Sequence, residues 1–248
     1  MEYTKLIDEN LKTTRARIAE AALRAGRHPD EVQLVAVSKT FPVHAILTAW
    51  ELGQRDFGEN RPEEGAEKIP QVEAALGDAQ RPVWHMIGHI QSRKAQLVVE
   101  HFAIVHSLDR RSLAEKLSRL AEKSGREIPV LLECNVSGEA SKYGYPVAGW
   151  EHDADVRAAF FSEVATLLTL PGLCLQGLMT IAPIVEDPET ARPVFASLRA
   201  LRDALRGRFP PVGWAHLSMG MTDDFEVAVE EGATLVRIGR AIFGTRNL

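Results

Sequence analysis

Eight short apolar segments alternate with helix-like segments along the 248-residue chain, and this alternation constrains the fold most strongly. The expected strands are Val32–Lys39, Arg55–Glu59, Val83–Gly88, Ala103–Leu108, Pro129–Val136, Leu173–Ile181, Trp214–Met219 and Thr234–Ile238. The expected helices between them are Val43–Leu52, Pro62–Leu76, Gln91–Glu100, Arg110–Lys123, Asp153–Leu170, Pro188–Arg206 and Asp223–Glu231. Strands that alternate with helices form parallel sheets. The sequence therefore predicts a single α/β domain over residues 1–248, a (β/α)8 TIM-type barrel, with an open doubly wound sheet as the alternative.

An additional helix is expected before the first strand, within residues 1–26. Leu6, Leu11, Ile18, Ala22 and Leu23 are spaced roughly like one face of a helix, and Gly26 is expected to end it. We expect this helix to pack on the barrel.

Composition excludes several classes of protein. The net charge is −5, which argues against binding to a nucleic-acid backbone. No apolar stretch is long enough to span a bilayer, and the N-terminus lacks a signal-peptide pattern, so a cytoplasmic location is expected. His85 and His89 are four residues apart, but no third ligand accompanies them, and no metal site is predicted.

Lys39 ends the apolar run from Leu34 to Val37. A lysine at the carboxyl end of a barrel strand stands where such proteins place their chemistry. A partly desolvated amine there is a candidate for Schiff-base formation. The alternative is a lysine that extends from the strand end into solvent or pairs with a carboxylate.

Polar side chains follow the other predicted strands and should converge on the same end of the barrel. They include Glu59, Asn60, His85, Ser107, Asp109, Glu133, Asn135, Thr180, His216, Ser218, Arg237 and Arg240. Each also has a structural interpretation. Asn60 and Asp109 are candidate helix caps, and Glu133 and Arg237 are a candidate buried ion pair.

The last two strand ends resemble phosphate-binding turns. Gly220 permits a tight turn after Ser218, and Thr222 or Asp223 is expected to cap the following helix. A second glycine, Gly239, follows the eighth strand. Barrels often bind phosphate between the loops after strands seven and eight. Two ordinary strand-to-helix turns are the alternative.

A lysine after the first strand and a phosphate site after the last two describe a site for pyridoxal 5'-phosphate (PLP). The chain resembles the pyridoxal phosphate homeostasis protein family, which is similar to the N-terminal barrel of alanine racemase. The resemblance runs from about Val32 to Gly244. The motifs on which it rests are Val35-Ala36-Val37-Ser38-Lys39, Phe57-Gly58-Glu59-Asn60, Trp84-His85-Met86-Ile87-Gly88, Ser107-Leu108-Asp109, Gly177-Leu178-Met179-Thr180-Ile181, Leu217-Ser218-Met219-Gly220-Met221 and Val236-Arg237-Ile238-Gly239.

The resemblance implies a role for each matching residue. Lys39 would hold PLP as a Schiff base, Asn60 would lie near the ring, and Arg237 would face the pyridine nitrogen. Ser218 and the backbone around Gly220 and Gly239 would hold the phosphate. Arg240 stands where the family commonly has a small hydroxyl residue, and it is expected to add a charge-assisted contact to the phosphate.

The expected function is PLP binding for homeostasis and delivery to apo-enzymes, by a monomer. An arginine at the pyridine nitrogen disfavours protonation of the ring and weakens it as an electron sink. Alanine racemases add a catalytic tyrosine from a second domain, which this chain is expected to lack, so no catalytic residue is predicted. The alternatives are a PLP-dependent amino-acid racemase and a cofactor-free phosphosugar barrel. Lys142 is a candidate second lysine for transfer, or a solvated loop lysine.

Overall fold

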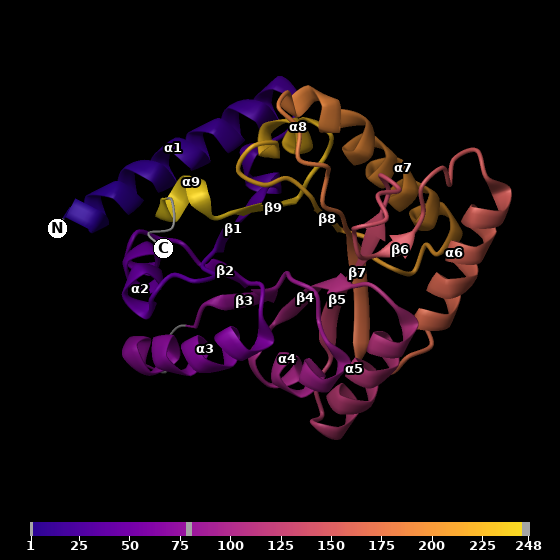
Figure 1. Cartoon of the computed structure of the whole chain (residues 1–248), viewed down its shortest axis with the longest axis horizontal. Coiled ribbons are helices and arrows are strands. Elements are labelled where there is room, and N and C mark those ends of the chain that lie inside the picture. The colour runs from indigo at the N-terminus through magenta and orange to yellow at the C-terminus, as the bar shows by residue number, and fades with distance from the viewer. Residues whose placement is uncertain (1, 78–80, 245–248) are drawn as a thin grey trace.

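Eight parallel strands close into a barrel in the computed structural model, which describes residues 2–77 and 81–244 (Figure 1). The barrel strands are β1 (Gln33–Val37), β2 (Asp56–Glu59), β3 (Val83–Met86), β4 (Ile104–Leu108), β5 (Ile128–Asn135), β7 (Leu173–Met179), β8 (His216–Ser218) and β9 (Leu235–Ile238). Each pairs with the next, and β9 returns to β1, with Val35 opposite Arg237. The predicted (β/α)8 barrel is confirmed, and the open sheet is excluded. A two-residue strand that the sequence did not predict, β6 (Tyr145–Pro146), pairs with the end of β5.

Helices surround the barrel on its outer side (Figure 1). They are α1 (Glu2–Arg24), α2 (Val43–Glu51), α3 (Pro62–Leu76), α4 (Ala95–His101), α5 (Arg111–Lys123), α6 (Ala154–Leu167), α7 (Arg192–Arg208), α8 (Phe225–Glu230) and α9 (Arg240–Phe243). Short 3-10 turns, η1 (Pro29–Glu31), η2 (Ser92–Lys94) and η3 (Pro188–Ala191), precede β1, α4 and α7. In the described part of the chain, no helix combines the length and apolar character needed to cross a bilayer.

The N-terminal helix α1 lies across α8 and α9 (Figure 1). Its buried face consists of Ile7, Leu11, Thr14, Ile18, Ala21 and Ala22, which follow a heptad-like spacing. The expected face was wrong at Leu6 and Leu23, which are exposed. Gly26, at φ +68°, ends the helix.

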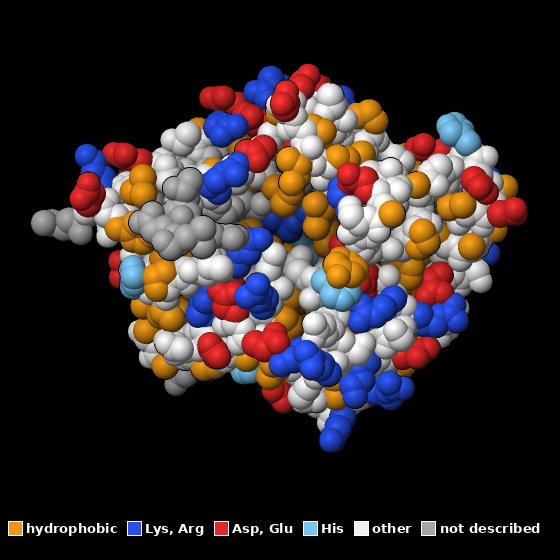
Figure 2. Space-filling view, viewed as in Figure 1, with side chains coloured by type: hydrophobic (Ala, Val, Ile, Leu, Met, Phe, Trp, Pro, Cys, Tyr) orange, Lys and Arg blue, Asp and Glu red, His pale blue; other side chains and the backbone are white. Residues whose placement is uncertain are grey.

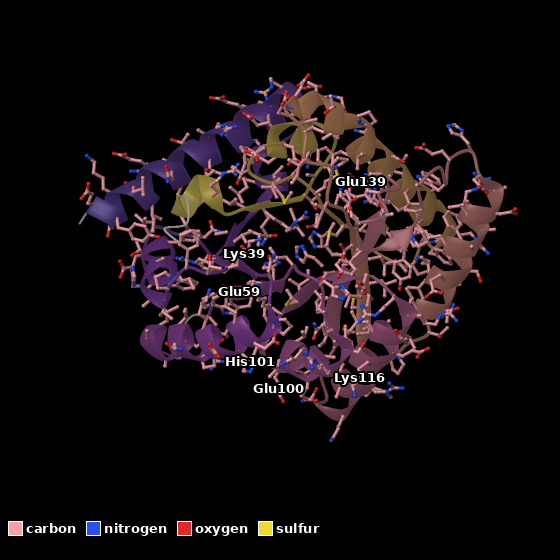
Figure 3. The ribbon with its side chains drawn as sticks, in the orientation of Figure 1. Lys39, Glu59, Glu100, His101, Lys116 and Glu139 are labelled. Atoms are coloured by element: carbon pink, nitrogen blue, oxygen red, sulfur yellow. The ribbon has the colours of Figure 1, made fainter. Side chains whose placement is uncertain are left out.

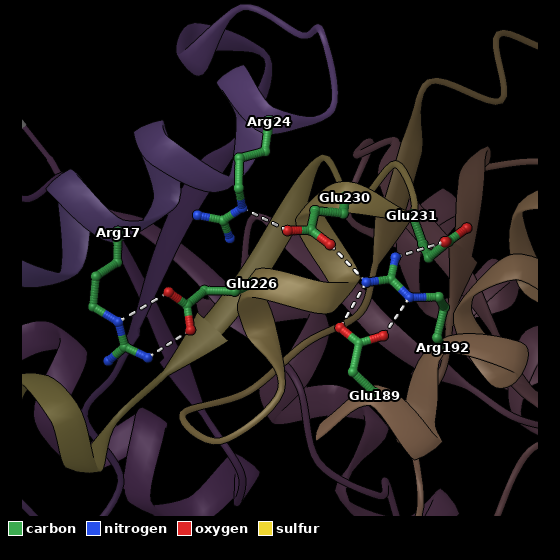
Figure 4. Close-up of polar contacts among 7 residues, drawn as sticks. All are labelled: Arg17, Arg24, Glu189, Arg192, Glu226, Glu230 and Glu231. Atoms are coloured by element: carbon green, nitrogen blue, oxygen red, sulfur yellow. Dashed lines mark hydrogen bonds and ion pairs between the residues drawn. The ribbon is translucent and has the colours of Figure 1, made fainter. Parts of the chain in front are cut away.

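Ion pairs along the edge of α1 fix its position (Figure 4). Arg17 binds Glu226 of α8 at 2.8 Å, and Arg24 binds Glu230 at 2.8 Å. Arg192, at the start of α7, also binds Glu230, at 2.6 Å. Networks of this kind contribute more than isolated surface pairs, so they tie α1, α7 and α8 together.

The barrel strands alternate between two environments. In β9, Leu235 and Arg237 point into the barrel, whereas Val236 and Ile238 join the large apolar core beneath the helices. The apolar cluster inside the barrel is small and consists of Val35, Leu131, Met179 and Leu235. Barrels usually fill this space with branched apolar side chains. Much of the interior is therefore left to polar residues.

Gly177 marks a place in the barrel wall where a side chain cannot fit. A Cβ atom there would lie 1.9 Å from the carbonyl oxygen of His216 on β8. We expect Gly177→Ala to lower the free energy of unfolding by about 3 kcal/mol, measured by urea denaturation. The matched control is Gly207→Ala in α7, where a Cβ meets nothing within 4 Å. The control should raise stability by up to about 1 kcal/mol. Equal effects of the two substitutions would contradict this account of the wall.

Candidate functional site

Lys39 lies two residues beyond the end of β1, at the carboxyl end of the barrel. Its side chain is half-buried. Figure 3 shows it near Glu59, which ends the neighbouring strand β2. Figure 2 shows a hollow near the middle of the molecular face, with Lys and Arg side chains beside it. The amine thus comes from the first strand and stands at the end of the barrel where parallel strands bring polar groups together.

A buried ion cluster holds the backbone on both sides of Lys39. Glu59, which is fully buried, accepts hydrogen bonds from the Ser38 hydroxyl at 2.7 Å and from Lys68 Nζ at 2.8 Å. Lys68 also donates to the Ser38 carbonyl at 2.8 Å and pairs with Glu64 at 2.7 Å. Glu64 accepts the backbone N–H of Thr40, whose φ of +68° is unfavourable for a residue with a side chain. These contacts fix the turn that carries Lys39.

Burial and the cation of Lys68 act in opposite directions on the pKa values of the two carboxyl groups in this cluster. The pKa of Glu59 is raised, because burial outweighs the charge and hydrogen bond of Lys68, which act to lower it. Burial also raises the pKa of Glu64, but hydrogen bonds from Lys68 and from the backbone of Thr40 outweigh it and leave that pKa lowered. Lys68 therefore pairs with the carboxyl groups of both Glu59 and Glu64.

Arg237 is a buried guanidinium inside the barrel. Its side chain donates to the Ser218 hydroxyl at 2.6 Å and to the Thr180 carbonyl at 2.8 Å. Burial lowers the pKa of Arg237 to about 10, and the charges of Asp224 and Glu133 act in the opposite direction, so the group stays charged at neutral pH. Glu133 thus acts on Arg237 through space, while the bonded partners are Ser218 and Thr180.

The loops after β8 and β9 are joined to each other. The backbone N–H of Arg237 donates to the Gly220 carbonyl at 3.0 Å, and Arg240 pairs with Asp223 at 2.7 Å. Gly220 has φ +93°, and a Cβ there would lie 2.6 Å from that of Ala228. A Cβ on Gly239 would lie 3.1 Å from the Val37 carbonyl. The second loop therefore packs against the end of β1, close to the turn that carries Lys39.

The expected cap of the helix after β8 was wrong. The N-cap of α8 is Asp224 rather than Thr222 or Asp223, and its carboxylate accepts the Met221 N–H at 2.6 Å. Asp224 therefore closes the turn after Gly220 instead of capping the first helical N–H groups.

The expected cap at Asp109 was also wrong. Arg110 is the N-cap of α5, and Asp109 pairs with Arg110 at 2.5 Å, while His89 Nδ1 lies 2.8 Å from its other carboxylate oxygen. His89 in turn stacks on Tyr143, with ring centroids 3.8 Å apart. Asn60 likewise caps no helix, since Arg61 is the N-cap of α3. Instead it lines a hollow of about 350 Å³ with Gly88 and His89.

The segment between β5 and β6 borders the mouth on the opposite side. Lys142 donates to the Ile181 carbonyl at 3.0 Å and pairs with Glu139, which Figure 3 labels. Lys142 and Tyr143 line a second hollow of about 200 Å³ together with Glu133. The segment thus lies against the end of β7, with Lys142 held by the chain.

Several residues of this end of the barrel were missed by reasoning from the sequence. Lys68 and Glu64 belong to a helix, and the helical period that buries Gly65, Ile69 and Val72 was the available signal for Lys68. His106 was missed although a histidine in the middle of an apolar strand indicates a polar interior.

Comparison with known proteins places the chain in a family. A curated protein of Vibrio alginolyticus named pyridoxal phosphate homeostasis protein is 42% identical over 242 residues, 97% of this chain and 98% of that one. The chain belongs to the pyridoxal phosphate homeostasis protein family. A model of the alanine racemase N-terminal domain family also matches it, over residues 10–247.

Two solved structures with the same architecture are similar over nearly the full length. A crystal structure of an unknown protein from Bifidobacterium adolescentis has a TM-score of 0.87 and 36% identity, covering 97% of this chain and 96% of that one. A structure of PipY from Synechococcus elongatus PCC7942 with PLP bound has a TM-score of 0.80 and 35% identity, covering 96% and 100%. Membership of the pyridoxal phosphate homeostasis protein family thus agrees with the barrel described above.

Removal of Lys68 from this family member should disturb the turn that carries Lys39. Lys68→Met leaves Glu59 buried without its cation, and we expect a loss of about 3 kcal/mol in the free energy of unfolding. The control is Lys94→Met, because Lys94 pairs with Glu63 at 2.9 Å in a more exposed setting. The control should cost less than about 1 kcal/mol in urea denaturation. A loss at Lys68 as small as that at Lys94 would show that the buried cluster contributes little.

Glu133 should make stability depend on pH. Burial raises its pKa to about 7 from 4.5, the charge of Asp109 adds to this, and Arg237 opposes it. The folded protein therefore holds this proton more tightly than the unfolded chain does. The stability that results is complete below the unfolded pKa of 4.5 and is lost as the pH rises through about 7.

Glu133→Gln removes this titration, since an amide does not ionise. Between about pH 5 and about pH 8, the cofactor-free wild type should lose on the order of 2 kcal/mol of unfolding free energy relative to the variant. Urea denaturation of both proteins at the two pH values measures the difference. A wild type and a variant that change in parallel with pH would rule out a raised pKa at Glu133.

Proposed function

We propose that this protein binds PLP as a Schiff base on Lys39 and takes part in PLP homeostasis, as a cytoplasmic monomer that delivers the cofactor to apo-enzymes. The observation that carries the proposal is the position of Lys39 at the end of β1, next to the strand that supplies Arg237. The names of the relatives and the PLP bound to PipY support the same cofactor.

The residues present fit the chemistry of PLP. An aldehyde requires an amine, which Lys39 supplies, and a phosphate requires donors, which the loops at Gly220 and Gly239 supply through their backbone. Arg240 brings a cation to the same two loops, although it is paired with Asp223. Asn60 lies at the rim of the mouth, beside Gly88. Ser218 was expected to hold the phosphate, and in the structure its hydroxyl accepts a hydrogen bond from Arg237.

Arg237 supports a binding role over efficient turnover. PLP supplies an aldehyde that condenses with amines and a ring that withdraws electrons, most strongly when its nitrogen is protonated. A guanidinium cannot accept a proton, and its charge disfavours a second positive charge beside it. A ring held against Arg237 is therefore a weak electron sink, which suits storage and delivery of the cofactor.

An amino-acid racemase is the second candidate, because the alanine racemase N-terminal domain family matches the chain. That reaction needs acid and base groups at the substrate. Tyr145 is buried, and burial raises the pKa of its hydroxyl strongly, while Tyr143 stacks on His89 at the mouth. Neither arrangement favours proton transfer. Saturable racemisation of alanine that disappears in Lys39→Ala would establish the enzyme instead.

Covalent trapping tests the anchor. Borohydride reduction of the PLP-loaded protein should fix the cofactor on the peptide that contains Lys39, and Lys39→Ala should abolish that adduct in mass spectrometry. Lys116→Ala is the control, since Lys116 lies on α5, away from the mouth (Figure 3). A main adduct that persists in Lys39→Ala would overturn the assignment.

Delivery is tested by mixing the PLP-loaded protein with an apo-enzyme while free PLP is trapped. Activation of the apo-enzyme despite the trap is the expected result. Activation that requires free PLP would contradict direct delivery and leave the anchor on Lys39 intact.

A further inference from the structure

A continuous chain of hydrogen bonds crosses the interior of the barrel and ends at Arg237. Its side chains come from five strands, and all are at most 8% exposed. The links are Arg237 Nη1 to Ser218 Oγ at 2.6 Å, Ser218 Oγ to His106 Nδ1 at 2.8 Å, His106 Nε2 to His85 Nδ1 at 2.9 Å, and His85 Nε2 to Asp56 Oδ1 at 3.0 Å.

The chemistry of the two ends gives this chain one direction. A guanidinium can only donate, and an ionised carboxylate can only accept. Ser218 accepts from Arg237, so its own hydrogen is available to His106 Nδ1. His106 then donates from Nε2 to His85 Nδ1, and His85 donates from Nε2 to Asp56. Every link is satisfied when both rings are neutral and carry their proton on Nε2.

The surroundings of His106 agree with a neutral ring. His106 is fully buried, and burial, which is the largest cause, together with the charge of Arg237 lowers its pKa well below the usual value. At the far end, Asp56 also accepts the side-chain amide of Gln33 at 2.6 Å. Two donors therefore converge on this carboxylate, which stabilises the negative end of the chain.

We propose that Asp56, His85, His106 and Ser218 are positioning residues that orient the guanidinium of Arg237. Ser218 and the Thr180 carbonyl occupy one N–H on each terminal nitrogen of the guanidinium. These two hydrogen bonds fix the orientation of the guanidinium, and they therefore fix the direction in which its remaining N–H groups point. In this arrangement the Ser218 hydroxyl accepts a hydrogen bond from Arg237. The phosphate is then bound by the backbone N–H groups of the adjoining loops. As far as the pyridine ring is concerned, this inference rests on the proposed function.

The direction of the chain is measured on the protein without cofactor. Nitrogen-15 labelling of histidine, read by two-bond proton–nitrogen correlation spectra, distinguishes protonated from unprotonated ring nitrogens. His85 and His106, assigned from His85→Asn and His106→Asn, should each carry the proton on Nε2. A proton on Nδ1 of either ring would overturn the direction and with it the proposal.

The effect on Arg237 is measured by the absorption spectrum of the bound PLP. His106→Phe removes the acceptor for Ser218, and the absorption band should shift because the pyridine nitrogen is no longer held against a fixed guanidinium. His106→Asn places an amide oxygen where Nδ1 lies, accepts from Ser218, and should keep the wild-type band. His152→Phe, at an exposed position before α6, is the matched control and should also keep the wild-type band.

A band that shifts in both His106 variants, or in neither, would contradict the positioning role. A wild-type protein that forms no PLP band would refute the proposed function, while the nitrogen spectra of the cofactor-free protein would still decide the direction of the chain.

Discussion

The pairing of β1 with β9 is the constraint on which the rest of the site depends. It closes the barrel by joining the first strand to the last, with Val35 opposite Arg237 and Ala36 opposite Ile238. Lys39 and Arg237 lie at opposite ends of the sequence, yet this register places them on adjoining strands. The same pairing seats Gly239 against Val37 and so brings the last loop to the turn that carries Lys39. Closure of the barrel therefore places side by side the strands that lead to the amine, the guanidinium and the two backbone turns.

The interior of this barrel contains few apolar side chains and is occupied largely by hydrogen-bonded polar side chains. Only a small apolar cluster of Val35, Leu131, Met179 and Leu235 is found among the described residues inside it. Buried polar groups destabilise a fold unless each finds a partner. The chain from Asp56 to Arg237 meets that condition with a charge at each end and neutral groups between. The apolar core between the strands and the helices is large, and it provides most of the burial that stabilises the fold.

Local patterns were sufficient to predict the barrel and to single out Lys39 as a candidate, while its assignment as the anchor came from the family resemblance and stays a prediction. Short apolar runs, helices between them and glycines after the last two strands are all visible in the sequence, and so is a lysine that ends an apolar run. Residues whose contacts form only when the barrel closes were harder to predict from the sequence. Lys68 looks like an ordinary helical lysine until β1 and β2 lie beside α3, and it then pairs with Glu59. Asp109 has the sequence position of a cap, but it pairs instead with Arg110, the residue that takes the N-cap position.

The structure on the two sides of the barrel mouth is therefore stabilised by different interactions. On the β1 side, the buried ion cluster of Ser38, Glu59, Glu64 and Lys68 holds a strained turn at Thr40. On the β9 side, hydrogen bonds through the barrel hold Arg237. We therefore expect the geometry of the site to be formed before PLP enters it.

A crystal structure of the protein soaked with PLP tests this most directly. We expect continuous density between Lys39 Nζ and the cofactor, with the pyridine nitrogen facing Arg237 and the phosphate between the loops at Gly220 and Gly239. Cofactor attached to another lysine, or a pyridine nitrogen turned away from Arg237, would contradict it.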